Sequence, residues 1–183
     1  MPDTDGFIFR IMKRIISLIC ALVAFCGVAS AQGDIESSTL LKKGMPVPEF
    51  TVPMLDGTTL NIAQLEGKVV LVNFWATWCP PCRKEFARLQ KDIIDRFNGE
   101  DFVMLPIAID DNMETVKKFM EKNGYTFPVA FDGNKTVYDI FAEKYVPRNF
   151  IIERDGKIAF HTVGYTPEEF DEMVEGIAKL LEE

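Results

Sequence analysis

Two cysteines separated by two residues are the part of this sequence best suited to chemistry. The run Trp78-Cys79-Pro80-Pro81-Cys82 holds both thiols, and the other cysteines, Cys20 and Cys26, fall in an apolar N-terminal run. A disulfide that stabilises a fold usually closes a long loop, because a longer loop constrains the unfolded chain more. A bridge across two residues contributes little in this way, so the spacing of Cys79 and Cys82 indicates a redox function.

A metal-binding or purely structural role fits this pair less well. The sequence has no second C-x-x-C and a single histidine, His161, so the ligands of a four-coordinate zinc site are lacking. We therefore expect a site that uses the two thiols and requires neither a metal nor an organic cofactor.

The elements around the pair are expected to place Cys79 at the start of a helix. Residues 69–75 are nearly continuous apolar sequence with β-branched side chains, which is typical of a central strand covered on both faces. From Pro81 the apolar residues recur at helical spacing until Asn98-Gly99 ends the helix. A helix N-terminus stabilises an anion, so Cys79 is the expected nucleophile and Cys82, one turn later, the buried resolving thiol.

The remaining chain alternates strands with helices and then forms a hairpin. Residues 50–52 and 58–60 flank Asp56-Gly57, a dipeptide that favours a tight turn. Further strands are expected at residues 102–109, 127–131, 149–153 and 158–163, with helices around residues 116–123, 137–141 and 166–181. Pro106 has no amide hydrogen to donate, so we expect a bulge or a break there. The alternation predicts a mixed sheet with helices on both faces.

The N-terminal residues have the features of an export signal. Basic residues precede an apolar run at residues 15–28, and Ala29-Ser30-Ala31 is the small-residue pattern that a signal peptidase cuts. We expect a signal peptide over residues 1–31, with Met12 as an alternative start. The run is short for a membrane span, so an uncleaved membrane anchor through residues 15–31 is the second interpretation.

Behind this segment we expect a lead-in over residues 32–46 and one domain over residues 47–183. The composition, 48% hydrophobic and 26% charged, is that of an ordinary globular protein. The 20 basic against 28 acidic residues give a formal charge of −8, so the chain lacks the basic surface that nucleic acid requires. We expect an exported monomer, periplasmic or otherwise extracytoplasmic, that binds no nucleic acid.

The stretch from Val72 to Glu85 resembles the active-site segment of exported thioredoxin-like proteins of the TlpA/ResA type, and the similarity runs from about Gly44 to the C-terminus. The resemblance implies an α/β thioredoxin fold with a mixed central sheet flanked by helices, an N-terminal β-hairpin and an inserted helix and strand at residues 113–131. It also implies a cis peptide between Val146 and Pro147. Their backbone would bind substrate beside the dithiol, and Trp78 would shape the same site.

The chain departs from related patterns in two places, at Asn73 and at the pair Arg148-Asn149. Asn73 replaces a buried aspartate that handles the resolving cysteine's proton in cytosolic thioredoxins, and Glu85 matches a glutamate often found in TlpA/ResA-type proteins. Glu85 is therefore a candidate for the missing role, with a first-turn acid facing solvent as the alternative. Arg148-Asn149 stands where many relatives carry small hydroxyl residues, and we expect this to alter which partner is accepted.

The sequence thus predicts a thiol-disulfide oxidoreductase of redox homeostasis that reduces disulfides in exported cysteine-containing proteins. Cys79 would attack the substrate disulfide and Cys82 would resolve the mixed disulfide. A membrane thiol reductase would then return electrons to the pair.

Three alternatives use the same cysteines differently. The first is a thiol oxidase with the same site. The second is a peroxiredoxin-like peroxidase, but such proteins carry a threonine three residues before the reactive cysteine, where this chain has Ala76. The third is a non-enzymatic copper chaperone using His161, although such sites usually space their cysteines one residue further apart.

Overall fold

The computed structural model describes residues 33–110 and 112–183. The chain divides into two compact units, Met1–Ser38 and Thr39–Glu183, and the second holds all the strands and helices named below. The signal peptide expected at residues 1–31 lies outside the described residues. Among the residues that are described, no helix is both long and apolar enough to cross a membrane.

A five-stranded sheet forms the centre of the second unit, with strand order β5-β4-β3-β6-β7. The strands are β3 Val69–Trp75, β4 Phe102–Ala108, β5 Ala130–Phe131, β6 Arg148–Ile152 and β7 Ile158–Val163. The strands β3, β4 and β5 are parallel, whereas β6 and β7 are antiparallel to their neighbours. The sequence-based expectation of a mixed sheet with a central strand at residues 69–75 is confirmed.

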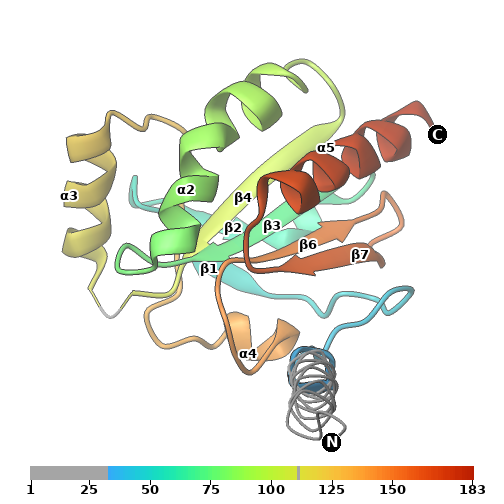
Figure 1. The fold of residues 1–183 in the computed structure, drawn as a ribbon, viewed down its shortest axis with the longest axis horizontal. Helices are drawn as coiled ribbons and strands as arrows, with labels where there is room; N and C mark the ends of the chain where they lie inside the picture. Colours follow the sequence, from blue (N-terminus) through green and yellow to red (C-terminus); the bar gives the residue numbers. More distant parts are fainter. Residues whose placement is uncertain (1–32, 111) are drawn as a thin grey trace, which may run out of the picture. The chain divides into compact units, whose positions relative to one another are not determined.

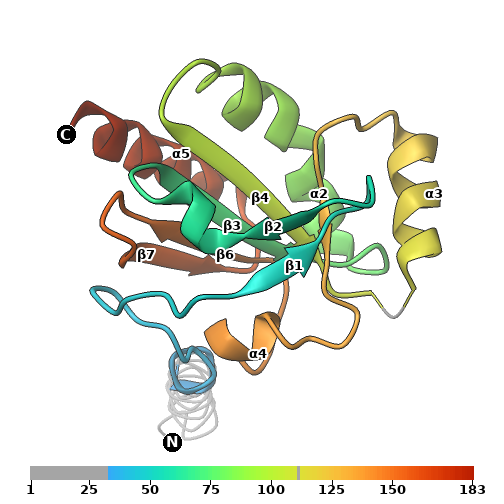
Figure 2. The same ribbon diagram turned by 180° about the vertical axis from the view of Figure 1, so that it is seen from behind.

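Helices cover both faces of this sheet. The helices α2 (Pro80–Leu89) and α5 (Pro167–Glu182) lie on one face, and the short helix α4 (Tyr138–Phe141) lies on the other (Figures 1 and 2). Figure 2 shows the hairpin of β1 (Thr51–Pro53) and β2 (Thr59–Asn61) on the α4 side. The 3-10 turn η1 (Ile62–Leu65) follows this hairpin, and α3 (Met113–Asn123) with β5 forms the expected insertion.

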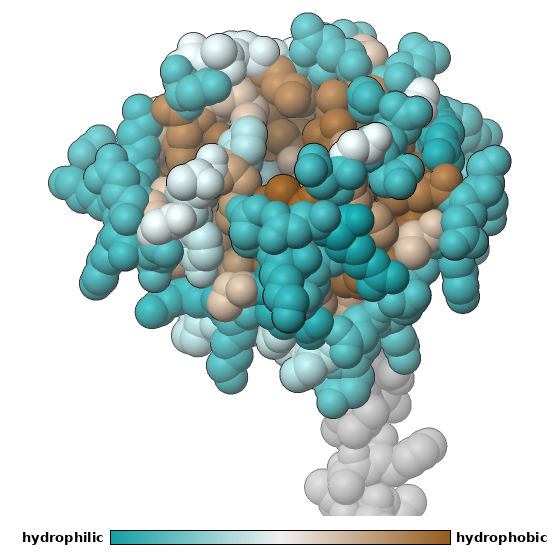
Figure 3. All heavy atoms as spheres, turned by 90° about the horizontal axis from the view of Figure 1, so that it is seen from above, coloured by the Kyte–Doolittle hydropathy of each residue, from teal (hydrophilic) through white to brown (hydrophobic). Residues whose placement is uncertain are grey.

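Aromatic side chains fill the core on each side of β3. Phe74 packs on Tyr138, Phe141 and Phe150, with ring centroids 5.2, 5.1 and 6.2 Å away. On the other face Trp75 packs on Phe86 of α2, with ring centroids 3.9 Å apart. Hydrophilic residues cover most of the surface seen in Figure 3, and hydrophobic residues lie in hollows among them. Burial on both faces explains why β3 is an almost uninterrupted apolar run.

The helix that follows the cysteines reaches the expected stop, but its second half is wound more loosely. α2 continues into η2 (Gln90–Asp95), a π-helical segment. The chain turns at Gly99, whose φ of 89° lies in the left-handed region that glycine adopts freely. Helical periodicity does not distinguish an α-helical from a π-helical turn over so short a segment.

The expected bulge at Pro106 is wrong, since β4 runs without interruption and Pro106 is opposite Asn73 of β3. The Ile109 N–H donates to the Trp75 carbonyl. Successive amides along a parallel strand point alternately to its two neighbours. Because the Ile109 amide points toward β3, an amide hydrogen at residue 106 would point toward β5. β5 pairs with β4 only at Ile107 and Ala108. The missing amide hydrogen therefore falls where no ladder bond is formed.

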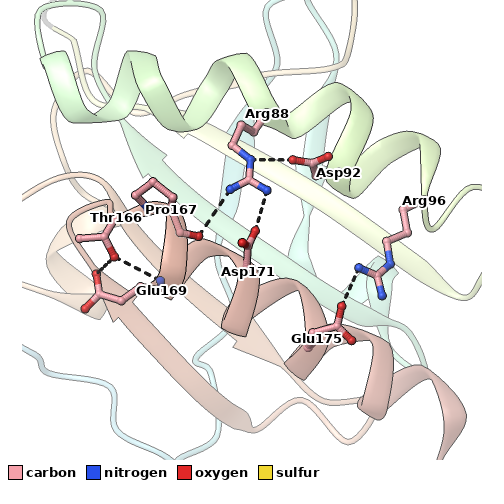
Figure 4. A network of polar contacts seen from close by, with 8 residues as sticks. All are labelled: Arg88, Asp92, Arg96, Thr166, Pro167, Glu169, Asp171 and Glu175. Carbon is pink, nitrogen blue, oxygen red and sulfur yellow. Dashed lines mark hydrogen bonds and ion pairs between the residues drawn. The ribbon is translucent and has the colours of Figure 1, made fainter.

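Ion pairs join α2 and η2 to α5. Arg88 Nε lies 2.6 Å from Asp92, and Arg88 Nη2 lies 2.6 Å from Asp171 of α5 (Figure 4). Arg96 pairs with Glu175 of α5 at 2.9 Å. Exposed pairs contribute little singly, but Arg88 is shared by two carboxylates and stacks over the Phe170 ring. This arrangement holds the helix that carries the two cysteines against α5.

Candidate active site

Cys79 and Cys82 form a disulfide at the N-terminus of α2, with an S–S distance of 2.05 Å. Cys79 is the N-cap residue, and the Cys82 N–H donates to Cys79 Sγ at 3.2 Å. Pro80 and Pro81 have no amide hydrogen, so the Cys82 amide is the first in the helix able to reach this sulfur. After reduction, the same amide and the helix dipole would stabilise a thiolate on Cys79.

The Val146-Pro147 segment lies directly against the first cysteine. The peptide between these residues is cis, as the resemblance implied. The Val146 carbonyl oxygen is 3.4 Å from Cys79 Sγ. In the dithiol state a Cys79 S–H could donate to this oxygen. Substrate binding by Val146 and Pro147 stays a prediction.

The two tryptophans of the motif occupy different environments. Trp75 is fully buried in the core, whereas the Trp78 side chain is 66% exposed next to Cys79. Cys79 itself is only 3% exposed in the oxidised state, and Cys82 is fully buried. An incoming thiol or disulfide must therefore approach Cys79 past the residues that surround it, among them Trp78.

Glu85 is a buried residue of α2, about one helical turn after Cys82, and is only 1% exposed. Asn73 Nδ2 donates to Glu85 Oε2 at 2.9 Å, and Asn149 Nδ2 donates to Oε1 at 2.6 Å. Asn73 also donates to Asn149 Oδ1 at 2.7 Å, which closes a triangle of three side chains. The interpretation of Glu85 as a first-turn acid facing solvent is wrong.

Burial raises the pKa of Glu85 from 4.5 to about 7, because the charged form is poorly solvated there. The hydrogen bonds from Asn149 and Asn73 favour the carboxylate and offset part of this effect. A group with a pKa near 7 exchanges protons readily at neutral pH. The Asn73 amide does not exchange a proton in this way, but it donates to the Glu85 carboxyl group, which does. The ionisable group is therefore supplied by α2 rather than by β3.

The expected effect of Arg148 and Asn149 on partner choice stays a prediction, and burial means that their side chains do not touch a partner directly. Arg148 is fully buried and Asn149 is 1% exposed. Asn149 also donates to Thr162 Oγ1 at 3.1 Å, besides holding Glu85. These positions follow Pro147 on β6, whose five residues are all buried. Their side chains therefore act inside the protein.

Asp110 is a residue of the site that the sequence analysis missed. Its carboxylate accepts hydrogen bonds from the Thr77 N–H at 3.0 Å and from Thr77 Oγ1 at 2.5 Å. Asp110 is 3% exposed and fixes the turn that leads from β3 to Cys79. The available signal was an acid directly after the strand parallel to β3, since the carboxyl ends of parallel strands share one edge of the sheet.

His161, the candidate copper ligand, stacks on Phe150 with ring centroids 5.7 Å apart. Phe150 is on the face of β6 opposite to Asn149. In the part of the chain that the structure describes, no three histidine, cysteine, aspartate or glutamate side chains are grouped as metal ligands.

A C-x-x-C disulfide at a helix N-terminus, next to a cis-proline segment of a thioredoxin fold, defines a thiol-disulfide oxidoreductase. Comparison with known proteins agrees. The chain belongs to the Redoxin family, whose model matches residues 42–181.

Individual relatives carry the same class of activity in their names. The chain is 29% identical over 170 residues to thiol-disulfide oxidoreductase ResA of Bacillus thuringiensis (strain Al Hakam), covering 93% of this chain and 95% of that protein. The chain is 30% identical over 158 residues to ResA of Oceanobacillus iheyensis, and the match covers 84% of this chain and 79% of that protein.

Solved structures show the same fold. A putative protein disulfide isomerase from Bacteroides thetaiotaomicron matches with a TM-score of 0.75 and 34% identity, over 80% of this chain and 94% of that one. A putative thiol:disulfide interchange protein DsbE from Chlorobium tepidum matches with a TM-score of 0.72 and 28% identity, over 77% of this chain and 99% of that one. This chain is therefore a thiol-disulfide oxidoreductase with a thioredoxin fold.

Proposed function

We propose that this oxidoreductase works as a reductant of disulfides in exported proteins, with Cys79 and Cys82 as its redox pair. The observation that carries the proposal is the placement of the pair. Cys79 Sγ accepts an amide hydrogen bond at the start of α2, and a buried carboxyl group lies one turn beyond Cys82. This arrangement supplies a nucleophile, a resolving thiol and a proton acceptor.

The reaction starts from the reduced pair. The Cys79 thiolate attacks one sulfur of the substrate disulfide, so a mixed disulfide forms and the other substrate sulfur leaves as a thiolate. Cys82 then loses its proton to Glu85 and attacks Cys79 Sγ. The second substrate sulfur is released, the Cys79–Cys82 bond forms, and two electrons have passed to the substrate.

Asn73 and Asn149 position the proton acceptor. Each donates to one oxygen of Glu85, which fixes the carboxyl group on the Cys82 side of α2. These two side chains are positioning residues, because they act on the reaction through Glu85.

Substrate is bound where Cys79 meets Val146. An extended substrate segment lies along the backbone of Val146 and Pro147, and its target sulfur approaches Cys79 beside the exposed ring of Trp78. The 3.4 Å separation of the Val146 oxygen and Cys79 Sγ supports this placement.

The proposed setting is outside the cytoplasm. Residues 1–31 act as a signal peptide or, uncleaved, residues 15–31 anchor the chain in the membrane. Residues 32–46 lead into a domain over residues 47–183, which acts as a monomer on cysteine-containing exported proteins. Because each turnover oxidises the Cys79–Cys82 pair, a membrane thiol reductase must reduce it again.

Turnover with a protein disulfide tests the reductase activity. With dithiothreitol as the electron source, the wild-type protein is expected to accelerate reduction of insulin disulfides, followed by the appearance of turbidity. Cys79→Ser should reduce insulin no faster than dithiothreitol alone. Lys84→Gln, at an exposed position between Cys82 and Glu85, should match wild type. A wild-type rate equal to that of dithiothreitol alone would contradict the proposal.

A further inference from the structure

Tyr145 has an unusual backbone for an aromatic residue. Its φ is 71°, in the left-handed region that glycine occupies freely and that bulky residues rarely adopt. The residue is also 48% exposed. A glycine would fit this backbone better, so a tyrosine at this strained position points to a use for its ring.

Two buried side chains hold the backbone around Tyr145. Tyr138 Oη donates to the Tyr145 carbonyl at 2.8 Å, and Arg148 Nε donates to the Lys144 carbonyl at 2.6 Å. Arg148 is itself tied to Thr39 Oγ1 at 2.8 Å. Because both donors belong to the core, the turn is fixed from within, and the conformation of Tyr145 is imposed by the fold.

This turn leads to the residue that contacts the reactive sulfur. Tyr145 directly precedes Val146, whose carbonyl oxygen is 3.4 Å from Cys79 Sγ. Trp78 directly precedes Cys79. Cys79 and Val146, the two residues in contact, are therefore each preceded by an exposed aromatic residue. Trp78 is 66% exposed and Tyr145 is 48% exposed.

We propose that Tyr145 is a specificity-determining residue, whose ring acts with that of Trp78 to bind an aromatic or aliphatic side chain next to the target cysteine of an extended substrate polypeptide. The inference rests on the proposed function, because it concerns the same disulfide exchange at Cys79. Tyrosine suits this task, since its ring offers a large contact area with few rotatable bonds.

The test compares small substrates that differ only beside the cysteine. Each is a short peptide whose single cysteine is linked by a disulfide to mercaptoethanol, with either phenylalanine or glycine on both sides of the cysteine. Bis(2-hydroxyethyl) disulfide serves as a substrate without any peptide. In each case the Cys79 thiolate displaces one sulfur of the substrate disulfide, and the rate is followed by acid quenching and mass spectrometry of the protein.

Wild type and Tyr145→Phe are expected to prefer the phenylalanine peptide by about twofold to tenfold, the range of one aromatic contact. Tyr145→Gly should lose this preference but react with the glycine peptide and bis(2-hydroxyethyl) disulfide within about twofold of wild type. Unchanged rates with the glycine peptide and with bis(2-hydroxyethyl) disulfide would show that the variant is folded and that its redox pair is intact. Glycine also suits the positive φ.

Two results would overturn the inference while leaving the proposed function standing: equal wild-type rates with the two peptides, or an undiminished preference in Tyr145→Gly. A wild-type protein that reacts with none of the three disulfides would refute the proposed function, and the specificity of Tyr145 with it.

Discussion

Replacing Cys82 by serine is expected to leave substrates covalently attached to the protein. Cys79 remains at the N-terminus of α2, so its thiolate still attacks a substrate disulfide. The second step needs a thiol at position 82, and serine cannot form the Cys79–Cys82 bond that releases the substrate. Catalytic reduction should fall by about 10³-fold or more, as for loss of a nucleophile. Dithiothreitol-sensitive adducts, seen on non-reducing gels and identified by mass spectrometry, should accumulate.

The matched controls are Cys79→Ser and the double variant, which should form no adducts. Both lack the sulfur that begins the reaction, while the fold around α2 is otherwise unchanged. If Cys79→Ser accumulated adducts and Cys82→Ser did not, the nucleophile and the resolving thiol would have to be exchanged in the mechanism.

Removing the ionisable group at position 85 is expected to slow the resolving step about 100-fold, the lower range for a positioned general base. Burial places the pKa of Glu85 at about 7. The carboxylate, which accepts the Cys82 proton, therefore increases as pH rises through 7. Wild-type reduction rates should rise over the same interval. Glu85→Gln should be slow and lack this inflection, as measured by single-turnover release of substrate thiol between pH 5 and 9.

Two further variants separate proton transfer from structure. Glutamine offers one acceptor oxygen where Asn73 and Asn149 now bind two, so it perturbs the triangle as well as the charge. Glu85→Asp keeps the acid and should retain a pH-dependent rate. Glu172→Gln changes an exposed acid of α5 and should behave as wild type. An unaltered pH profile in Glu85→Gln would contradict the role of Glu85.

Local sequence patterns were enough to predict the elements that carry the redox pair. The apolar run of β3, the helical spacing after Pro81 and the stop at Asn98-Gly99 each lie within a short segment. The cap and proline at Thr166-Pro167 likewise mark the start of α5, where Thr166 Oγ1 accepts from the Glu169 N–H. Such signals depend on neighbouring residues, so they can be interpreted without knowledge of the fold.

The buried polar network could not be predicted in this way. Glu85 and Asn149 are 64 residues apart in sequence, and they meet because β6 pairs with β3 so that Asn149 is opposite Asn73. Register between distant strands is not encoded in the periodicity of either strand. The same limit explains Pro106, whose effect depended on the side of β4 to which its nitrogen points.

The fixed turn before Pro147 also depended on the fold. The resemblance implied the position of Val146, but neither the left-handed backbone of Tyr145 nor its hydrogen bond from Tyr138 follows from the sequence pattern. Arg148 illustrates the same point, because the burial of this charged side chain does not follow from the sequence pattern either.

The reduction potential of the Cys79–Cys82 pair tests the reductive role most directly. The protein would be equilibrated with dithiothreitol or glutathione redox buffers, and the oxidised fraction measured after acid quenching and thiol alkylation. We expect a potential near that of thioredoxin, about −270 mV, and far from the strong-oxidant value of about −120 mV. A potential above about −150 mV would contradict the reductive assignment and make the same two cysteines an oxidant of thiols.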